Sequence, residues 1–309
     1  MKTTKQCPIC LKCDSHFLIS TQAHMQNEKK IFSFDKCNFC ESIFLINPPN
    51  EEEISNYYSK EYFPYLSEKA WGKYSYFVKL WGDKLNKKRV QFVIKQFKNF
   101  TPETQIIDFG CGSPTFLKNL KNKTQSHCIG FDFSDNGWNQ DKENFKDLEL
   151  ISKDFKSISF LKKFNIITMW HSLEHHFHPK DLISHFYKLS SENALLIIEV
   201  PNYNSLTRFI QKENWAGFHT PRHSVIYTPQ TLQYLLENEG WKVQKIYRYG
   251  TLDSYTLWWL GKLENLQKNK HSDLEKLFLH FVFFKILYFP LFIFEKFFNF
   301  GVMTLVCRK

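Results

Sequence analysis

The sequence predicts an α/β fold built on a mostly parallel sheet, preceded by a small cysteine-containing module. From residue 105 onward, short apolar segments alternate with helical patterns, which is typical of a sheet covered by helices on both faces. The first 48 residues instead carry two tight cysteine pairs. A chain of 309 residues has room for one large domain of roughly 200 residues and a smaller module.

The composition is that of a folded, basic protein. Hydrophobic residues make up 43% of the chain, which is ample for a packed core and excludes a disordered polypeptide. Lysine and arginine outnumber aspartate and glutamate by 41 to 31, giving a net charge of +10. This charge would suit a nucleic-acid or anionic-membrane partner, but it is scattered rather than gathered into runs, so a lysine-rich proteome explains it equally well.

The N-terminus, MKTTKQCPIC, has no apolar run of the kind found in signal peptides, so we expect a cytoplasmic protein with reduced or metal-bound cysteines. Four cysteines form two pairs that can supply the thiolates of a structural zinc ion: Cys7, Cys10, Cys37 and Cys40. The 26 residues between the pairs (11–36) fit the longer hairpin of a zinc ribbon. Two pairs of unligated thiols are the alternative. Nearby residues that could substitute as ligands are Cys13, His16 and His24.

A boundary follows the cysteine module at Pro48 and Pro49. Asn50, with Glu53 three residues later, gives a capping-box pattern that begins a helix. An aromatic-rich helical stretch then extends to about Phe100, either as a lid over the next domain or as a structural connector. The predicted domains are a zinc ribbon (1–48), a helical linker or lid (49–100) and an α/β domain (101–309).

Seven segments of the α/β domain have the apolar composition of strands. They are residues 105–110, 126–134, 148–154, 164–172, 194–202, 243–250 and 301–309. A helix at 228–240 has a clear start at Thr228 and Pro229 and a stop at Gly240. Ligands of such folds bind at the carboxyl ends of the strands, so we expect the functional site there.

The first strand leads into the loop DFGCGSPTFL, in which Gly110 and Gly112 let the main chain pass close to a ligand. Asp132 ends the next strand, 22 residues after Gly110, where a carboxylate can accept hydrogen bonds from both hydroxyls of a ribose. Together these features indicate a nucleotide cofactor. Either a dinucleotide or S-adenosylmethionine satisfies them.

With three further segments, the order of motifs resembles the class I S-adenosylmethionine-dependent methyltransferases. These segments are SKDF (152–155), WHSLEHHFHP (170–179) and IIEVPN (197–202). The resemblance covers roughly residues 100–309. It is greatest to a type 23-like branch with a leucine-Glu-His signature after the fourth strand and an N-terminal cysteine ribbon, often acting on small molecules or on envelope glycans and lipids. It implies a Rossmann-like, seven-stranded sheet whose last strand is antiparallel.

The resemblance also implies which residues bind the cofactor. Asp108 and the backbone of 110–112 would hold its amino-acid end, Asp132 the ribose, and Asp154 with Phe155 the adenine. The full set of candidate cofactor-binding residues is Asp108, Gly110, Cys111, Gly112, Asp132, Phe133, Asp154, Phe155 and Trp170. Pro114 stands where a third glycine is usual and removes an N–H donor, so we expect an altered loop rather than lost binding.

Methyl transfer is an in-line displacement on a sulfonium, so positioning of the acceptor supplies much of the acceleration. A hydroxyl or carbon acid also needs a base, and the candidate catalytic residues after the fourth strand are His171, Glu174 and His175. Alternatively, Glu174 and His175 only brace the wall of the site. A metal ion at the clustered histidines is a further alternative that the sequence favours less, because histidines in a loop are often polar surface.

A second cluster, NWAGFHTPRHSVIYTP, follows the fifth strand. In the branch that this sequence resembles, the insertion at this point folds over the acceptor. The candidate substrate-binding residues are therefore Trp215, His219, Arg222 and His223. Arginine would suit a phosphate or carboxylate on the acceptor, because its planar fork binds either. The alternative is a packed loop that fixes the sheet to the following helix.

The segment 277–300 is long enough to span a bilayer, but several polar residues and a proline interrupt it: His280, Lys285, Pro290, Glu295 and Lys296. A lysine near the centre of a spanning helix costs about 2.5 to 3.5 kcal/mol. We therefore expect a hydrophobic insertion at about 274–300, forming a helical pair that lies in a membrane interface or packs on an acceptor with a lipid tail. A hairpin buried against the domain or in a dimer is the alternative.

The sequence thus predicts a cytoplasmic methyltransferase that uses S-adenosylmethionine, holds a structural zinc ion and acts on a small-molecule, lipid-linked or glycan-linked acceptor. Peripheral contact with the inner face of the membrane would run through 277–300. RNA methylation is a second hypothesis, but the fourth strand lacks the Asn/Asp-Pro-Pro-aromatic motif of exocyclic-amine methylation, so nucleic acid is the less favoured partner. A cofactor-binding scaffold without turnover is a third.

Overall fold

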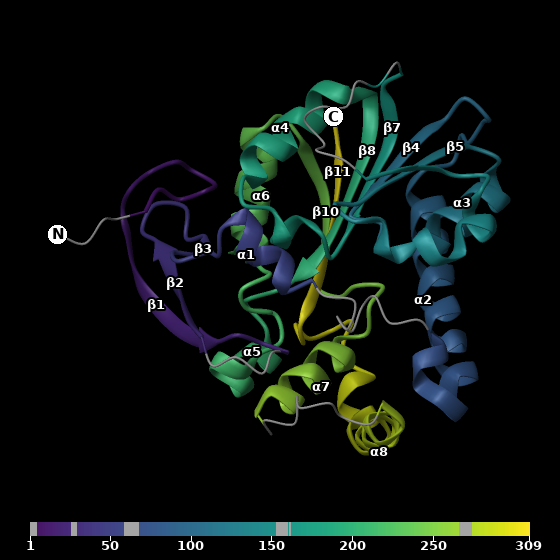
Figure 1. Ribbon diagram of the computed structural model, residues 1–309. Helices are drawn as coiled ribbons and strands as arrows, with labels where there is room; N and C mark the ends of the chain where they lie inside the picture. Colours follow the sequence, from purple (N-terminus) through teal and green to yellow (C-terminus); the bar gives the residue numbers. More distant parts are fainter. Residues whose placement is uncertain (1–4, 26–29, 59–67, 153–159, 161, 266–273) are drawn as a thin grey trace.

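The computed structural model describes residues 5–25, 30–58, 68–152, 160, 162–265 and 274–309, and its centre is a seven-stranded sheet (Figure 1). The strand order is β10-β11-β8-β7-β4-β5-β6. The strands are β4 (Gln105–Phe109), β5 (His127–Phe131), β6 (Glu149–Ile151), β7 (Phe164–Trp170), β8 (Ser190–Pro201), β10 (Lys242–Tyr247) and β11 (Val302–Arg308). β11 runs antiparallel to both of its neighbours, whereas the ladders from β6 to β8 are parallel, which confirms the predicted sheet.

Helices cover both faces of this sheet, because each central strand sends apolar side chains alternately to either side. Ile107 and Phe109 of β4 pack into the core beneath α4 and α6, and Ile106 packs into the core beneath α2 and α3. Figure 1 shows the two helix layers on opposite sides of the strands. Their bounds are α2 (Ser75–Gln96), α3 (Thr115–Thr124), α4 (Pro179–Leu189) and α6 (Pro229–Asn238).

A second, four-stranded sheet joins the cysteine module to the α/β domain. Its order is β1-β2-β3-β9, and all three pairings are antiparallel. The strands are β1 (Ser15–Gln22), β2 (Ile31–Cys37), β3 (Ile43–Leu45) and β9 (Val225–Ile226). Because β9 belongs to the loop that follows β8, the ribbon is hydrogen-bonded through its backbone to the α/β domain. Phe44 of β3 lies in the same buried cluster as Tyr227 and Leu232.

The connector begins as the sequence predicts. Asn50 N donates to Glu53 Oε2 at 3.3 Å and Glu53 N donates to Asn50 Oδ1 at 2.8 Å, so the capping box at the start of α1 (Glu51–Asn56) is confirmed. The short helix η2 (Glu68–Tyr74) then leads into α2. Other short helices are η3 (Asp135–Gly137), η4 (Asn139–Phe145), η6 (Leu173–His175) and η7 (Lys212–Asn214).

Three helices lie beyond the carboxyl ends of the parallel strands (Figure 1): α5 (Leu206–Gln211), α7 (Ser254–Asn265) and α8 (Leu274–Phe292). The expected helical pair within 277–300 is wrong, because this segment supplies the single helix α8, and α7 is the helix that packs against it. Pro290 lies inside α8 near its end. Within the described part of the chain, no helix combines the length and the apolar character needed to cross a membrane.

Candidate active site

The loop after β4 places its two glycines in different surroundings. Gly110 has φ +76°, and a Cβ atom there would lie 2.3 Å from Cβ of Ser172. Gly112 has φ +50°, and no atom lies within 4 Å of the position that its Cβ would take. Gly110 is therefore needed for close packing against the turn after β7, while Gly112 alone leaves main chain open to a ligand.

Two buried carboxylates lie beside this loop, at the ends of β4 and β5. Asp132 Oδ2 accepts a hydrogen bond from Gly112 N at 2.8 Å, and Thr168 Oγ1 donates to Asp108 Oδ1 at 2.6 Å. Burial raises the pKa of Asp132 and raises that of Asp108 to about 7. The carboxylates and the open backbone of Gly112 thus form one polar edge, with acceptors suited to an ammonium group and to ribose hydroxyls.

The other predicted cofactor residues take three different positions. Phe133 is 58% exposed next to Asp132, with its ring edge-on to Phe109, so it can contact a ligand at this edge. Cys111 and Trp170 are buried, and the ring of Trp170 lies edge-on to that of Phe116 in α3. Asp154 and Phe155 lie outside the described residues.

Pro114 fits this loop without strain. It stands at the N-cap of α3 with φ −78°, and its carbonyl accepts a hydrogen bond from Lys118 N. Since the first N–H groups of a helix have no partner within the helix, a proline costs little there.

His171 is held between two carboxylates after β7. Its Nε2 donates to Glu199 Oε1 at 3.2 Å, and its Nδ1 lies 3.5 Å from Glu174 Oε1. Burial opposes protonation of His171, but the two carboxylates outweigh it and raise the pKa of the ring to about 9. Burial is the largest influence on Glu199 and opposes its charge, yet its pKa falls to about 2, because the bond and charge of His171, the charge of Arg89 and the bond from Thr251 N together outweigh burial. At neutral pH the pair is an imidazolium and a carboxylate.

The sequence analysis missed Glu199, which is the best-connected acid of the site. Although fully buried in β8, it accepts hydrogen bonds from Thr251 N at 2.5 Å, Leu252 N at 3.1 Å and Thr304 Oγ1 at 3.2 Å. Arg89 of α2, also missed, bonds Thr251 Oγ1 at 3.4 Å and lies over the ring of Trp170. The sequence did contain one signal for Glu199, which is a single acid inside the apolar segment IIEVPN. A buried acid needs partners, so such a residue indicates a polar contact in the core.

The structure brings together residues that the sequence placed in two separate clusters. Glu174 and His175 of η6 meet His223 from the loop before β9, and the rings of His175 and His223 lie 4.5 Å apart. Burial lowers the pKa of both histidines, so they are neutral. The ring of His219 lies 5.1 Å from that of His223, on the same side. Two of the predicted catalytic residues, Glu174 and His175, thus share one wall with two of the predicted substrate-binding residues, His219 and His223.

Trp215 and Arg222 lie behind this wall. Trp215 is fully buried and donates through Nε1 to Thr207 Oγ1 at 3.2 Å. Arg222 donates to the carbonyl of Tyr57 at 2.7 Å and to that of His24 at 3.0 Å. In this arrangement both side chains support the loop, and contact between them and an acceptor stays a prediction.

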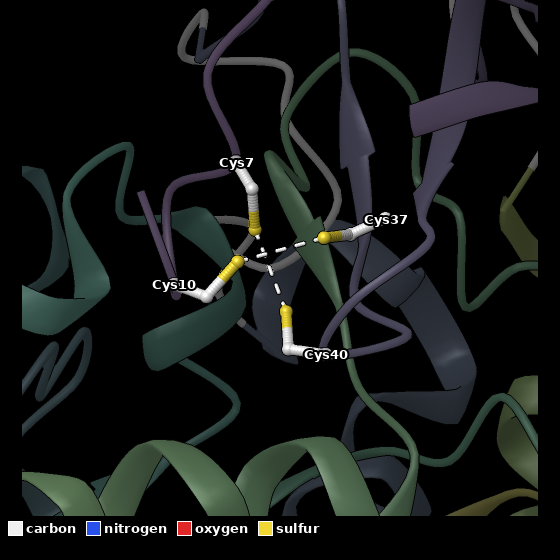
Figure 2. Close-up of side chains that lie close together, drawn as sticks. All are labelled: Cys7, Cys10, Cys37 and Cys40. Carbon is white, nitrogen blue, oxygen red and sulfur yellow. Dashed lines mark hydrogen bonds between the residues drawn. The ribbon is translucent and has the colours of Figure 1, made fainter. Parts of the chain in front are cut away.

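The four paired cysteines converge in the ribbon, as Figure 2 shows. Sγ of Cys7 lies 3.6 Å from Sγ of Cys40, and Sγ of Cys10 lies 3.5 Å from Sγ of Cys37. A tetrahedral zinc ion with Zn–S bonds of about 2.3 Å places its sulfur ligands about 3.8 Å apart, so the thiols fit such an ion with small adjustments. The suggested substitutes lie elsewhere: Cys13 is exposed, His16 bonds Asn38, and His24 bonds the carbonyl of Glu213.

The doubly wound sheet with its antiparallel β11, and the glycine loop joined to Asp132, define a class I S-adenosylmethionine-dependent methyltransferase. A family model described as a methyltransferase domain matches residues 80–246, and the chain belongs to this family of enzymes. A search of curated proteins found no significant match.

Solved structures show the same fold. The cyclopropane synthase MmaA2 from Mycobacterium tuberculosis is 13% identical, with a TM-score of 0.50 over 72% of this chain and 83% of that one. The mycolic acid cyclopropane synthase CmaA1, solved in complex with SAH and CTAB, is 13% identical with a TM-score of 0.51 over the same shares.

We predict that Glu199→Gln strongly destabilises the protein. The substitution keeps the shape of the side chain but leaves the partly buried His171 cation without its main partner, which costs up to about 3 to 5 kcal/mol. Urea denaturation should show this loss. Glu192→Gln, at an exposed position of the same strand, should change the free energy of unfolding by less than about 0.5 kcal/mol. Equal stability of the two variants would contradict the assigned role of Glu199.

Proposed function

We propose that this enzyme methylates a lipid-linked acceptor at a membrane surface, using S-adenosylmethionine as methyl donor. The observation that carries the acceptor class is the apolar outer face of α8, which lies beyond the catalytic edge. A small soluble acceptor is the alternative. The cofactor side of the proposal rests on the polar edge formed by Asp108, Gly112 and Asp132.

In the proposed cofactor site, Asp108 faces the ammonium of the methionine part and Asp132 accepts hydrogen bonds from the ribose hydroxyls. The open backbone at Gly112 lets the cofactor approach the loop closely, since no protein atom lies within 4 Å of its Cβ position. Phe133 offers an exposed ring at the adenine side. The bound cofactor would supply an electrophilic methyl group on a sulfonium.

The chemistry asks the protein to position and activate the acceptor. A bond forms between the acceptor's nucleophilic atom and the methyl carbon, the carbon–sulfur bond breaks, and its electron pair stays on sulfur. The acceptor loses a proton in the process. We assign its activation to Glu174 and His175, because His171, with a pKa of about 9, already holds a proton at neutral pH.

Three polar residues of the 277–300 segment bond the protein, whereas Lys296 is exposed. Lys285 Nζ bonds Asp253 Oδ2 at 2.6 Å, His280 Nδ1 accepts from Trp259 Nε1 at 2.9 Å, and Glu295 Oε2 accepts from Ser254 N at 3.2 Å. α8 also buries Phe278, Phe281 and Phe292, so this helix is apolar on both faces. An ordinary surface helix has one apolar stripe and a polar outer face, so the second apolar face supports an apolar environment on the outside of α8.

Apolar side chains cover the outer face instead. Phe297 is 76% exposed, Ile286 71% and Phe283 62%. Further exposed apolar residues of α8 and of the turns that follow it are Leu279, Leu287, Phe289, Leu291, Ile293, Phe294 and Phe298. Leu206, Phe209 and Ile210 of α5 are also exposed, and Leu206 N donates to the carbonyl of Asn299. Lys276 and Lys296 are also exposed here, as suits an interface with anionic lipid. So many exposed apolar side chains close together mark an interaction surface.

We also propose that the ribbon holds a structural zinc ion. The support is the convergence of four thiols within 4.8 Å of one another, with Ile9 N donating to Cys7 Sγ at 3.5 Å. Cys7 and Cys40 lie in the same hydrophobic core as the catalytic sheet. Zinc would therefore stabilise the whole protein and not only the ribbon.

Binding of S-adenosylmethionine tests the cofactor site. Asp132→Ala removes the proposed acceptor for two ribose hydroxyls, so calorimetry should show an affinity about 10- to 100-fold lower than wild type. The matched control is Asp147→Ala, at an exposed aspartate that precedes β6. Unchanged affinity in Asp132→Ala would sink the assignment of Asp132.

Sedimentation with vesicles of phosphatidylcholine and phosphatidylglycerol tests the outer face of α8. The double variant Phe294→Glu/Phe297→Glu should bind the vesicles at least about tenfold less. Each glutamate places a charge where, on the membrane, an apolar ring would be buried in lipid. Phe17→Glu, on an exposed ribbon aromatic, is the control. Equal sedimentation of both variants would reject the membrane surface. Salt-dependent retention on RNA would favour a nucleic-acid acceptor instead.

Zinc analysis tests the ribbon. Cys40→Ser should hold one equivalent of zinc less than wild type, and its melting temperature should fall by about 5 °C or more, since metal binding is linked to folding. Cys13→Ser, an exposed cysteine of the same module, should behave as wild type. Identical zinc content in both variants would be incompatible with the four-cysteine site.

A further inference from the structure

Glu174, His175 and His223 form a group of metal-ligand side chains separate from the four cysteines. One carboxylate oxygen and one ring nitrogen of each histidine lie within 4.8 Å of one another. Hydrogen bonds fix the two segments that carry them: Ser224 N donates to the Glu174 carbonyl at 2.8 Å, and Ser224 Oγ donates to the His176 carbonyl at 2.8 Å. The three side chains are thus held in place by backbone contacts.

Glu174 is the first sign that this group is incomplete. Its side chain is 1% exposed, and among the described residues neither carboxylate oxygen has a hydrogen-bond partner. His171 Nδ1 lies 3.5 Å from Glu174 Oε1, which is too long for a good hydrogen bond, and the other nitrogen of that ring bonds Glu199 at 3.2 Å. A buried carboxylate without hydrogen bonds is costly, so a positive ligand is expected there.

His223 is the second sign, because its tautomer is fixed. Nδ1 lies 2.7 Å from the carbonyl oxygen of Gly217, which can only accept, so Nδ1 carries the hydrogen and Nε2 carries a lone pair. That Nε2 lies 3.9 Å from Glu174 Oε1. Two acceptors therefore face each other at a distance too long for a hydrogen bond. Metal-ligating histidines typically donate their other nitrogen to a carbonyl in this way.

We propose that Glu174, His175 and His223 bind a divalent cation of the Zn²⁺ class. Ligands about 2.0 to 2.2 Å from such an ion lie about 3.4 Å apart at a tetrahedral angle, so a small inward shift of the three side chains completes the site. Tyr58 Oη, 2.8 Å from His175 Nδ1, orients the second histidine. A donor set of two imidazoles and one carboxylate leaves coordination positions for another molecule.

The site adjoins the cofactor edge, because Ser172 Oγ, next to η6, donates to the carbonyl of Phe109 at 2.6 Å. An ion there would bind an oxygen of the acceptor and lower the pKa of its hydroxyl. Glu174 and His175 would then activate the acceptor as ligands rather than as a base. This catalytic part rests on the proposed function, whereas binding of the ion does not.

Metal content after equilibration with Zn²⁺ and removal of excess tests the proposal. Glu174→Gln and His223→Ala should each hold one equivalent of zinc less than wild type. His178→Ala, at an exposed histidine of the same loop, should hold as much as wild type. The comparison does not depend on the cysteine site, which is intact in all four proteins. Equal zinc content in all of them overturns the proposal.

Two measurements keep the result clear. Should a variant fail to fold, anomalous scattering from wild-type crystals soaked in Zn²⁺ decides: a peak among Glu174, His175 and His223 supports the site, and its absence there overturns it. Calorimetry with S-adenosylmethionine on the same samples is expected to show unchanged binding. If the wild-type protein does not bind S-adenosylmethionine, the proposed function is refuted, while the metal result stands on its own.

Discussion

The buried carboxylate of Glu199 joins more parts of this protein than any other described polar contact of the site. It lies in β8, pairs with the His171 cation after β7, and accepts hydrogen bonds from Thr304 of β11 and from Thr251 and Leu252 ahead of α7. These bonds therefore fix β11, the last strand along the chain, and the start of α7 to the turn that carries Glu174. Because a buried charge is tolerated only when its partners are in place, these segments fold together.

The ribbon is part of the same construction. β3 pairs with β9, and Ser224, one residue before β9, bonds the carbonyl of Glu174. The loop from 215 to 226 thus links the cysteine module to the wall of the active site. Arg222 strengthens this link through the carbonyls of His24 and Tyr57. Main-chain pairing and the Arg222 side chain thus connect the ribbon to the segment that carries His223.

The sequence was most informative where one residue type has one physical use. The alternation of strands and helices, the glycine loop, Asp132 and the cysteine pairs each predicted an element that the structure contains. Long-range relations could not be read in this way. Nothing in the pattern shows that His223 meets Glu174, since 48 residues separate them (175–222), or that Gly110 serves packing against Ser172 while Gly112 faces open space. Arg222 was predicted as a substrate contact because arginine suits phosphate, yet its guanidinium bonds two main-chain carbonyls, a use that depends on the tertiary fold. His280, Lys285 and Glu295 were interpreted as interruptions of an apolar segment, whereas in the structure each bonds a residue between 253 and 259.

The most direct test of a cofactor site at the carboxyl edge is backbone hydrogen exchange with and without S-adenosylhomocysteine. Slower exchange should be confined to the loop after β4 (109–113) and the end of β5 (130–134), with little change in the ribbon strands 31–45. Unchanged exchange at both segments in the presence of saturating ligand, or protection found only elsewhere in the chain, would contradict a cofactor site built on Asp108, Gly112 and Asp132.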